Sequence, residues 1–188
     1  MSTQTIKNIT VLGAGTMGHG IAQVAAMSGF ETVLFDIDAN ALDHGLSRVQ
    51  GNLDKGVQRG KVTEEMRDET LARLSGTHVL SDAVEDTDLV IEAAPERMDI
   101  KTSIFRQLDE LAPPHAILAT NTSSLSVSTI AESVRDSARV VGMHFFNPVH
   151  ILKLLEVVCA RQTSADVLAQ VQAVGVQIDG VRAVVVVD

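Results

Sequence analysis

The chain has 188 residues, a length that favours a single domain. Its formal net charge of -9 argues against nucleic acid as a partner, because such a surface repels phosphate backbones. Aromatic residues make up 3% of the chain, without Trp or Tyr. The core must therefore consist mainly of Val, Ala, Leu and Ile, as in buried parallel sheets.

The sequence lacks the signals of secretion, membrane insertion and metal binding. No apolar stretch reaches membrane-spanning length, and residues 1–10 have no signal-peptide pattern. The single cysteine, Cys159, cannot form an internal disulfide and reads as a small buried hydrophobe. We therefore expect a soluble, cytoplasmic protein. No metal site is expected, because the following histidines show no ligand spacing: His19, His44, His78, His115 and His150.

Short apolar runs alternate with helical patterns along the chain. Strands are expected at 9–12, 32–35, 77–80, 89–92, 117–120, 140–145, 153–158 and 183–187. Helices are expected at 16–28, 39–59, 63–74, 98–111, 126–133 and 165–174. The alternation predicts an α/β fold with a Rossmann-type, doubly wound and mostly parallel sheet. The strands at 140–145 and 153–158 are joined by few residues, which predicts an antiparallel pair near the C-terminal end.

The run Gly13-Ala14-Gly15-Thr16-Met17-Gly18 matches the pattern G-x-G-x-x-G between a strand and a helix. Its glycines allow a tight turn, a close approach of backbone to a pyrophosphate, and close packing of helix on strand. Asp36 lies eighteen residues after Gly18, where its carboxylate could accept the hydroxyls of an adenosine ribose and repel a 2′-phosphate. We therefore predict NAD rather than NADP as the cofactor. The alternative is a glycine-rich turn with a surface aspartate; Asp38 is the candidate N-cap of the next helix.

One histidine and one glutamate lie on the two predicted antiparallel strands. A neutral imidazole at His144 is suited to accept a hydroxyl proton, and a carboxylate at Glu156 would stabilise the imidazolium that forms. Ser123 follows a predicted strand, where residues of the crevice lie in such sheets. The alternative roles are a core histidine with an acid paired elsewhere, and a turn or N-cap serine.

The predicted helix at 39–59 carries a basic stripe. Lys55 and Arg59 each fall within about 20° of Arg48 at 100° per residue, away from the apolar face. The stripe could bind phosphate groups, or it could be a solvated helix face.

Taken together, these motifs resemble the NAD-binding domain of the L-3-hydroxyacyl-CoA dehydrogenase family, including the bacterial 3-hydroxybutyryl-CoA dehydrogenases. The resemblance runs from about Ile6 to Asp188. It rests on four blocks: Gly13–Ala22, Glu96–Lys101, Asn121–Leu125 and His144–Glu156. It implies oxidation of a 3-hydroxyacyl-CoA to the 3-ketoacyl-CoA, with hydride passed to NAD, as in fatty acid metabolism and beta-oxidation.

The resemblance also implies roles for single residues. His144 matches the catalytic base, Glu156 the acid that orients it, and Ser123 the serine that contacts the substrate oxygen. Lys55 lies near the family's CoA-contacting lysine and reads as substrate-binding. Without the resemblance, Lys101 reads as a solvated helix charge and Asn147 as a turn residue. The side of the site that holds the nicotinamide ribose would be lined by Glu96, Lys101, Ser123 and Asn147.

The whole of 1–188 reads as the family's NAD-binding domain. The family continues into a helical domain that completes the acyl-CoA cleft and supplies the interface of homo-oligomers, usually dimers. The chain stops directly after the valine run at 184–187, so we expect that it was cut there or that a following domain is missing. Two alternatives to the enzyme stay open. One is an NAD-binding module with little turnover by itself; the other, a dehydrogenase of free 3-hydroxyacids, is disfavoured by the His-Phe-Phe-Asn-Pro block.

Overall fold

A computed structural model describes residues 5–152, 154–178 and 182–188. The strands are β1 (Asn8–Leu12), β2 (Glu31–Phe35), β3 (Leu74–Thr77), β4 (Leu89–Glu92), β5 (Ile117–Thr120), β6 (Val140–Phe145), β7 (Leu154–Cys159) and β8 (Arg182–Val187). The helices are α1 (Gly18–Met27), α2 (Ala39–Gln58), α3 (Glu64–Ala72), α4 (Leu80–Val84), α5 (Met98–Leu111), α6 (Val127–Ala131), α7 (Ala165–Gln177) and the short 3-10 helix η1 (Ser137–Arg139).

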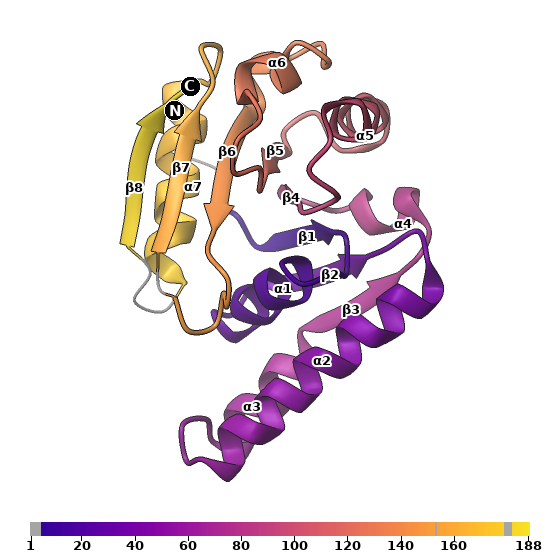
Figure 1. The fold of residues 1–188 in the computed structure, drawn as a ribbon, viewed down its shortest axis with the longest axis vertical. Helices are drawn as coiled ribbons and strands as arrows, with labels where there is room; N and C mark the ends of the chain where they lie inside the picture. Colours follow the sequence, from indigo (N-terminus) through magenta and orange to yellow (C-terminus); the bar gives the residue numbers. More distant parts are fainter. Residues whose placement is uncertain (1–4, 153, 179–181) are drawn as a thin grey trace.

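The strands lie side by side in the order β3-β2-β1-β4-β5-β6-β7-β8 (Figure 1). Neighbouring strands are parallel except β6 and β7, which are antiparallel. This confirms the predicted Rossmann-type α/β fold, including the antiparallel pair near the C-terminal end. The strand order reverses between β1 and β4, and such a switch point opens a crevice at the carboxyl ends of the strands.

Two hydrophobic clusters cover the two faces of the sheet. On one face, the side chains of Ile21 and Ala22 in α1 and of Val171 in α7 pack on sheet residues such as Val11 and Ile91. The other face packs against α4, α5 and α6, as Val90 and Leu118 do against Phe105. Adjacent strand residues point to opposite faces, so a strand buried on both faces must be apolar throughout.

The helices α2 and α3 project beyond the sheet as an arm (Figure 1). Asp38 is the N-cap of α2, as predicted, because its carboxylate accepts the Asn40 amide at 2.8 Å. The helix ends before Gly60, whose φ of 65° lies in the left-handed region that glycine favours. Among the described residues, no helix combines the length and apolar character needed to span a bilayer.

The strand prediction at 77–80 is wrong. The observed strand β3 comes three residues earlier, and Leu80 begins helix α4. The segment Leu74–Thr77 is polar and half exposed at the sheet edge, so it carries no apolar pattern. A Cβ on Gly76 would lie 2.9 Å from the side chain of Leu46, so glycine there lets α2 pack closely. In the predicted strand at 153–158, Lys153 lies outside the described residues.

Candidate active site

The glycine-rich turn joins β1 to α1 at the switch point. A Cβ on Gly18 would lie 1.6 Å from the carbonyl oxygen of Gly13, so the turn cannot close with a larger residue at 18. Gly13 itself has φ +98°, and a Cβ there would lie 2.9 Å from the carbonyl oxygen of Ala93. At Gly15, by contrast, a Cβ would meet nothing within 4 Å. The turn thus leaves open space beside bare backbone at the N-terminus of α1, where phosphate groups bind.

The remaining turn residues and Asp36 fit the same interpretation. Thr16 is exposed, and Met17 is half buried against the core. Asp36 directly follows β2, and its Oδ2 accepts the Ala14 amide at 2.8 Å. The carboxylate therefore lies against the glycine turn, where the ribose of a dinucleotide is bound in this fold. Asp38 points into the cap of α2 instead. These residues fit an NAD molecule with its pyrophosphate on the turn.

His144 and Glu156 lie opposite each other in the register of β6 and β7. Nδ1 of His144 lies 2.8 Å from Oε2 of Glu156. An ionised carboxylate only accepts hydrogen bonds, so Nδ1 carries the proton and Nε2 is left as the basic nitrogen. The side chains are 18% and 37% exposed, respectively, so the pair is accessible. The structure brings this predicted pair together.

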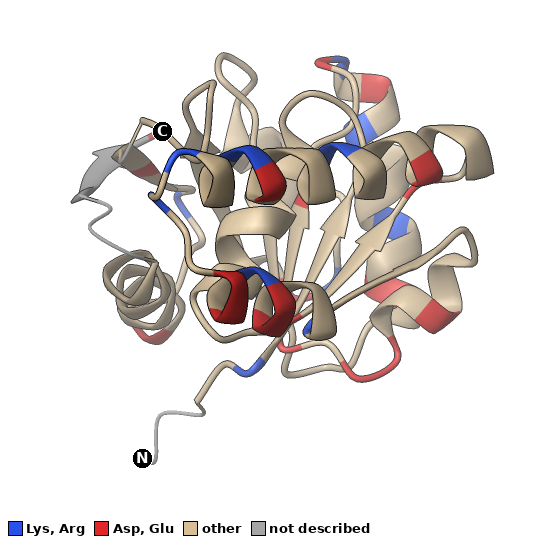
Figure 2. Ribbon diagram, turned by 90° about the horizontal axis from the view of Figure 1, so that it is seen from below, with Lys and Arg blue, Asp and Glu red and all other residues tan. Residues whose placement is uncertain are grey.

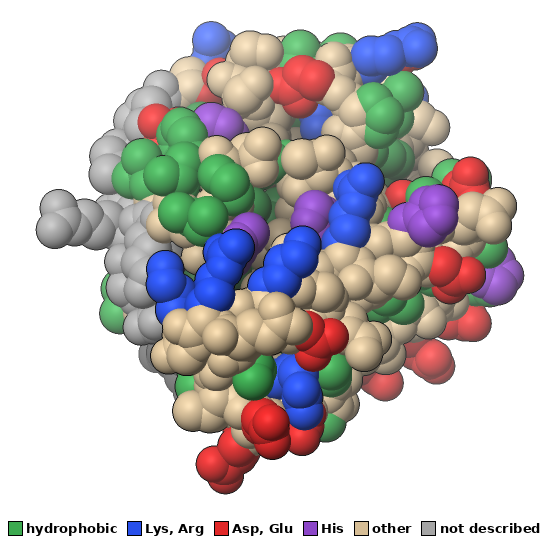
Figure 3. All heavy atoms as spheres, turned by 60° about the horizontal axis from the view of Figure 1, so that its bottom comes forward, with side chains coloured by type: hydrophobic (Ala, Val, Ile, Leu, Met, Phe, Trp, Pro, Cys, Tyr) green, Lys and Arg blue, Asp and Glu red, His purple; other side chains and the backbone are tan. Residues whose placement is uncertain are grey.

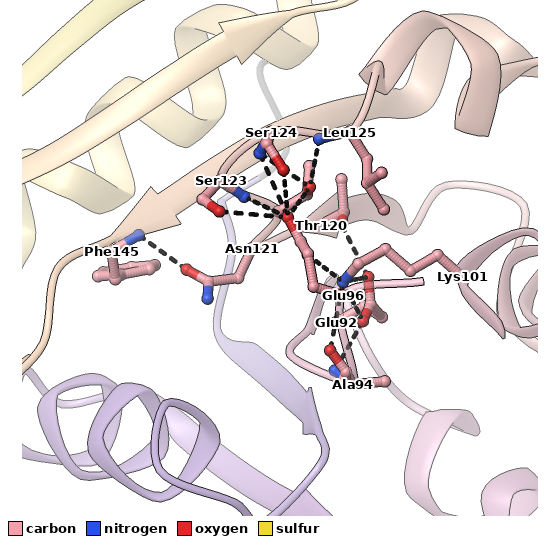
Figure 4. Close-up of polar contacts among 11 residues, drawn as sticks. Glu92, Ala94, Glu96, Lys101, Thr120, Asn121, Ser123, Ser124, Leu125 and Phe145 are labelled. Carbon is pink, nitrogen blue, oxygen red and sulfur yellow. Dashed lines mark hydrogen bonds and ion pairs between the residues drawn. The ribbon is translucent and has the colours of Figure 1, made fainter. Parts of the chain in front are cut away.

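The neighbours of His144 hold its ring in place. The Phe146 ring lies with its centroid 4.4 Å from that of the imidazole, tilted by 50°. The adjacent Phe145 is buried in the core on the other side of the strand, and its amide donates to Oδ1 of Asn121 at 2.8 Å (Figure 4). Asn121 follows β5, so this bond connects the loop that carries Ser123 to the strand that carries His144.

The loop after β5 wraps around the carboxylate of Glu96 (Figure 4). Oε1 of Glu96 accepts the Thr122 hydroxyl at 2.6 Å and the amides of Ser123 and Ser124 at 2.9 and 3.2 Å. The Ser123 hydroxyl lies farther away, at 3.3 Å from the same oxygen. Burial alone would raise the pKa of Glu96. The Thr122 and Ser123 donors and the Lys101 charge outweigh burial and lower that pKa to about 2.

The alternative roles of Ser123 are filled by other residues. Ser126 is the N-cap of α6, since its hydroxyl accepts the Thr129 amide. Thr122 makes the local turn, because its hydroxyl oxygen accepts the Leu125 amide at 3.0 Å. Ser123 is exposed and its hydroxyl can turn from Glu96 to a ligand.

Lys101 is not a solvated helix charge. Its side chain is 1% exposed, and its Nζ lies 2.8 Å from Oε1 of Glu92, which is wholly buried. The same Nζ lies 3.5 Å from Oε2 of Glu96. Lys101 thus lies beneath Glu96 rather than at the surface, and its predicted contact with the cofactor stays a prediction. Sequence reasoning missed Glu92, although a glutamate closing the run Leu89-Val90-Ile91 was a usable signal.

The basic stripe borders two hollows, one on the arm and one between the arm and the rest of the domain. One, of about 520 Å³, is lined by Arg48, Asn52 and Lys55. The other, of about 630 Å³, lies between Lys55 and Arg59 and an apolar segment around Ile151. Figure 2 shows basic and acidic residues interspersed along α2, and Figure 3 shows a row of basic side chains beside a hydrophobic patch. Lys55 lines both hollows, and its predicted contact with the substrate stays a prediction.

The remaining predictions concern Asn147 and metal binding. Asn147 is exposed two residues after the end of β6, next to Pro148. Its predicted contact with the nicotinamide side of the site stays a prediction. Across the described ranges, no group of three or more His, Cys, Asp or Glu side chains gathers as metal ligands do.

Known proteins are similar to this chain in sequence and in fold. The family model "3-hydroxyacyl-CoA dehydrogenase, NAD binding domain" matches residues 8–188. The 3-hydroxyadipyl-CoA dehydrogenase of Escherichia coli (strain K12) is 45% identical over 168 residues, which are 88% of this chain and 34% of that protein. The crystal structure of a 3-hydroxybutyryl-CoA dehydrogenase from Escherichia coli K12 superposes with a TM-score of 0.94 at 40% identity, covering 98% of this chain and 39% of that one.

A third relative is shorter. The crystal structure of the (S)-3-hydroxybutyryl-CoA dehydrogenase from Ralstonia eutropha has a TM-score of 0.94 at 38% identity, covering 98% of this chain and 64% of that one. The chain therefore spans from about one third to just under two thirds of the length of these relatives.

Proposed function

The chain belongs to the 3-hydroxyacyl-CoA dehydrogenase family as an NAD-binding domain, and we propose that it oxidises a 3-hydroxyacyl-CoA to the 3-ketoacyl-CoA. The observation that carries this proposal is the 2.8 Å contact between His144 and Glu156 at the carboxyl end of β6. A dehydrogenase of this type needs a base for the hydroxyl proton beside the hydride acceptor. The relatives named above act on CoA thioesters according to their names, which supports this substrate class.

In the proposed mechanism, Nε2 of His144 accepts the proton of the substrate 3-hydroxyl group. The imidazolium that forms is stabilised by Glu156 on Nδ1, in a pair that is only partly exposed to water. The Ser123 hydroxyl donates to the substrate oxygen, which develops carbonyl character as the C–H bond breaks. Bound NAD supplies the acceptor for the hydride that leaves carbon 3 of the substrate.

Cofactor binding is proposed to use the turn from Gly13 to Gly18 for the pyrophosphate and Asp36 for the adenosine ribose. Glu96, Lys101, Ser123 and Asn147 are proposed to form the nicotinamide ribose side. Glu96 suits that role because its side chain is 38% exposed and its pKa is lowered to about 2. It is therefore ionised at neutral pH and can accept hydrogen bonds from hydroxyl groups.

We propose that Lys55 and Arg48 contact the phosphate groups of the CoA moiety. The support is their position at a hollow in a basic stripe, on a chain of net charge -9. We propose homo-oligomers and a role in beta-oxidation on the basis of the resemblance. The cytoplasmic location expected from the sequence stays a prediction, and one plant relative is named a peroxisomal protein.

A second candidate function is an NAD-binding module with little turnover. The observation that favours it is that the chain spans 64% of the Ralstonia eutropha relative. Residues outside that share could close the site over His144 and Glu156 and exclude water.

The experiment is reduction of acetoacetyl-CoA by NADH with the whole chain, followed by loss of NADH absorbance. We expect turnover in the wild type and a loss of about 10²–10⁴-fold in His144→Ala, the usual contribution of a general acid or base. The matched control is His115→Ala. His115 pairs with Asp88 at the amino end of β4, whereas the site lies at the carboxyl ends of the strands, so its loss should leave turnover unchanged. NADH binding without turnover would favour the module, and no binding would contradict both functions.

A further inference from the structure

Glu92 is wholly buried at the end of β4, and its carboxylate is fully engaged within the protein (Figure 4). Oε1 accepts the Ala94 amide at 2.7 Å and Lys101 Nζ at 2.8 Å. Oε2 accepts the Thr120 hydroxyl at 2.7 Å and Lys101 Nζ at 3.0 Å. A carboxylate offers about four acceptor sites, so Glu92 has none left for a ligand. Any functional effect of Glu92 must pass through the residues that it holds.

The surroundings do not explain an ion pair at this position. Apart from Thr120, which lies opposite Glu92 in the register of β4 and β5, nearby strand residues such as Ile91 and Leu118 are aliphatic and wholly buried. Well-packed apolar side chains of similar volume are often as stabilising as a buried ion pair, because both charges must leave water. Stability alone therefore gives little reason for Glu92 and Lys101. Their position at the strand ends, directly below the loops of the proposed site, suggests another reason.

Lys101 connects Glu92 to Glu96. Its Nζ lies between the two carboxylates, bonded to Glu92 and 3.5 Å from Oε2 of Glu96. Oε1 of Glu96 in turn holds the amides of Ser123 and Ser124. A chain of charged contacts thus runs from the buried end of β4 to the exposed loop after β5.

Glu92 also fixes the neighbouring turn. By accepting the Ala94 amide, its side chain holds the segment after β4 in place. That segment approaches the glycine turn so closely that a Cβ on Gly13 would lie 2.9 Å from the carbonyl oxygen of Ala93. The main-chain carbonyl of Glu92 accepts the Asn121 amide at 2.7 Å, which also ties the start of the loop after β5 to the end of β4.

We propose that Glu92 is a positioning residue that holds Lys101 and, through it, Glu96 and the loop at 122–124 in the arrangement that binds the cofactor. This inference rests on the proposed function, since it assigns Glu96 and Ser123 to the same site. Replacement of Glu92 by glutamine keeps the shape but removes the charge that fixes Lys101. Lys101 then shifts toward Glu96 and draws that carboxylate away from the loop amides.

The test compares two variants, each of which removes one carboxylate charge from an ion pair that includes a residue of α5. Glu92→Gln acts on the pair at the start of the helix. Asp109→Asn acts near its end, where Asp109 binds Arg135 and Arg139. Asp109 also accepts the Arg135 amide at 3.2 Å, which gives the control its own reporter. Residue-resolved amide hydrogen exchange is measured by NMR on the whole chain without cofactor.

We expect Glu92→Gln to speed exchange at the Ser123 and Ser124 amides by about tenfold, the effect of one lost charged hydrogen bond. Asp109→Asn should speed exchange at the Arg135 amide and leave the two serine amides unchanged. Serine amides that exchange within about twofold of the wild-type rate in folded Glu92→Gln would overturn the proposal, because the loop would then not depend on Glu92.

A second readout is the affinity for NADH, titrated by fluorescence. Glu92→Gln should weaken binding about tenfold, and Asp109→Asn should leave it within about twofold. If Glu92 only stabilised the fold, both variants would have a lower melting temperature and the NADH affinity of neither would change. If the wild type does not bind NADH, the proposed function fails, whereas the exchange measurement still decides whether Glu92 orders the loop.

The exchange test also has a variant for the case that Glu92→Gln does not fold. Thr120→Val removes one donor to Glu92 and keeps both charges and nearly the same side-chain volume. It should speed exchange at the Ser123 and Ser124 amides about threefold, less than Glu92→Gln, because one bond to Glu92 is lost while its ion pair with Lys101 is kept. Unchanged exchange at these amides in Thr120→Val would then overturn the proposal.

Discussion

Replacing Glu156 by glutamine should slow turnover while leaving the fold and cofactor binding intact. The amide oxygen of glutamine still accepts the bond from Nδ1 of His144, so the imidazole keeps its orientation. What is lost is the negative charge 2.8 Å from that nitrogen. The charge matters most when the imidazole is protonated, which is the state that follows proton transfer from the substrate.

The size of the effect follows from the geometry of the pair. A hydrogen bond to a charged group contributes about 1.5–3 kcal/mol to the state that it stabilises. Glu156 is 37% exposed, so solvent screens part of its charge and the lower end of that range applies. About 1.5 kcal/mol corresponds to a roughly tenfold lower kcat for Glu156→Gln.

The assay is NADH-dependent reduction of acetoacetyl-CoA, with Glu31→Gln as the control. Glu31 is an exposed glutamate at the amino end of β2, whereas the site lies at the carboxyl ends of the strands. In His144→Ala, the further change Glu156→Gln should cost nothing, because the pair no longer exists. A kcat for Glu156→Gln within about twofold of wild type, or full additivity in the double variant, would refute the assigned role of Glu156.

Four further predictions test other parts of the site. Gly18→Ala should lower the free energy of unfolding by about 3 kcal/mol in urea titrations, since its Cβ would lie 1.6 Å from a backbone oxygen. Gly15→Ala should keep the stability of wild type within about 0.5 kcal/mol but weaken NADH binding, because the methyl group fills the open space beside the turn. The folded pKa of Glu96 is lowered from 4.5 to about 2, so its stabilising effect is present above pH 4.5 and is lost as the pH falls toward 2. Glu96→Gln should therefore be less stable than wild type by about 1–2 kcal/mol near neutral pH, a value reduced for solvent exposure, and the difference should shrink on acidification. Lys55→Ala should raise the KM for acetoacetyl-CoA about threefold at low salt and less at high salt, while the KM for NADH stays the same; an equal rise in both would contradict a CoA contact.

The sequence predicted those parts of the fold that depend on local patterns. The bounds of α5 and β6 agree with the observed ones, because a periodic apolar face followed by Pro113 and a continuous apolar run are strong signals. The pairing of His144 with Glu156 was predictable for the same reason, since a short connection between two strands makes them antiparallel neighbours.

Parts that depend on packing were not predictable in this way. The edge strand β3 has a polar, glycine-containing sequence, and its place is set by contacts with α2. The pairing of Lys101 with Glu92 depends on how α5 packs on the sheet. One signal was available, because Lys101 shares the helical spacing of the buried residues Phe105 and Leu108 and so occupies the buried face of α5.

The proposed function requires that the proton acceptor and the nicotinamide ring share one crevice at the carboxyl ends of the strands. A crystal structure of the chain with bound NADH measures this directly. We expect the pyrophosphate at the N-terminus of α1 and the nicotinamide ring beside Ser123 and Nε2 of His144. A cofactor bound elsewhere, or a nicotinamide ring directed away from β6, would contradict it.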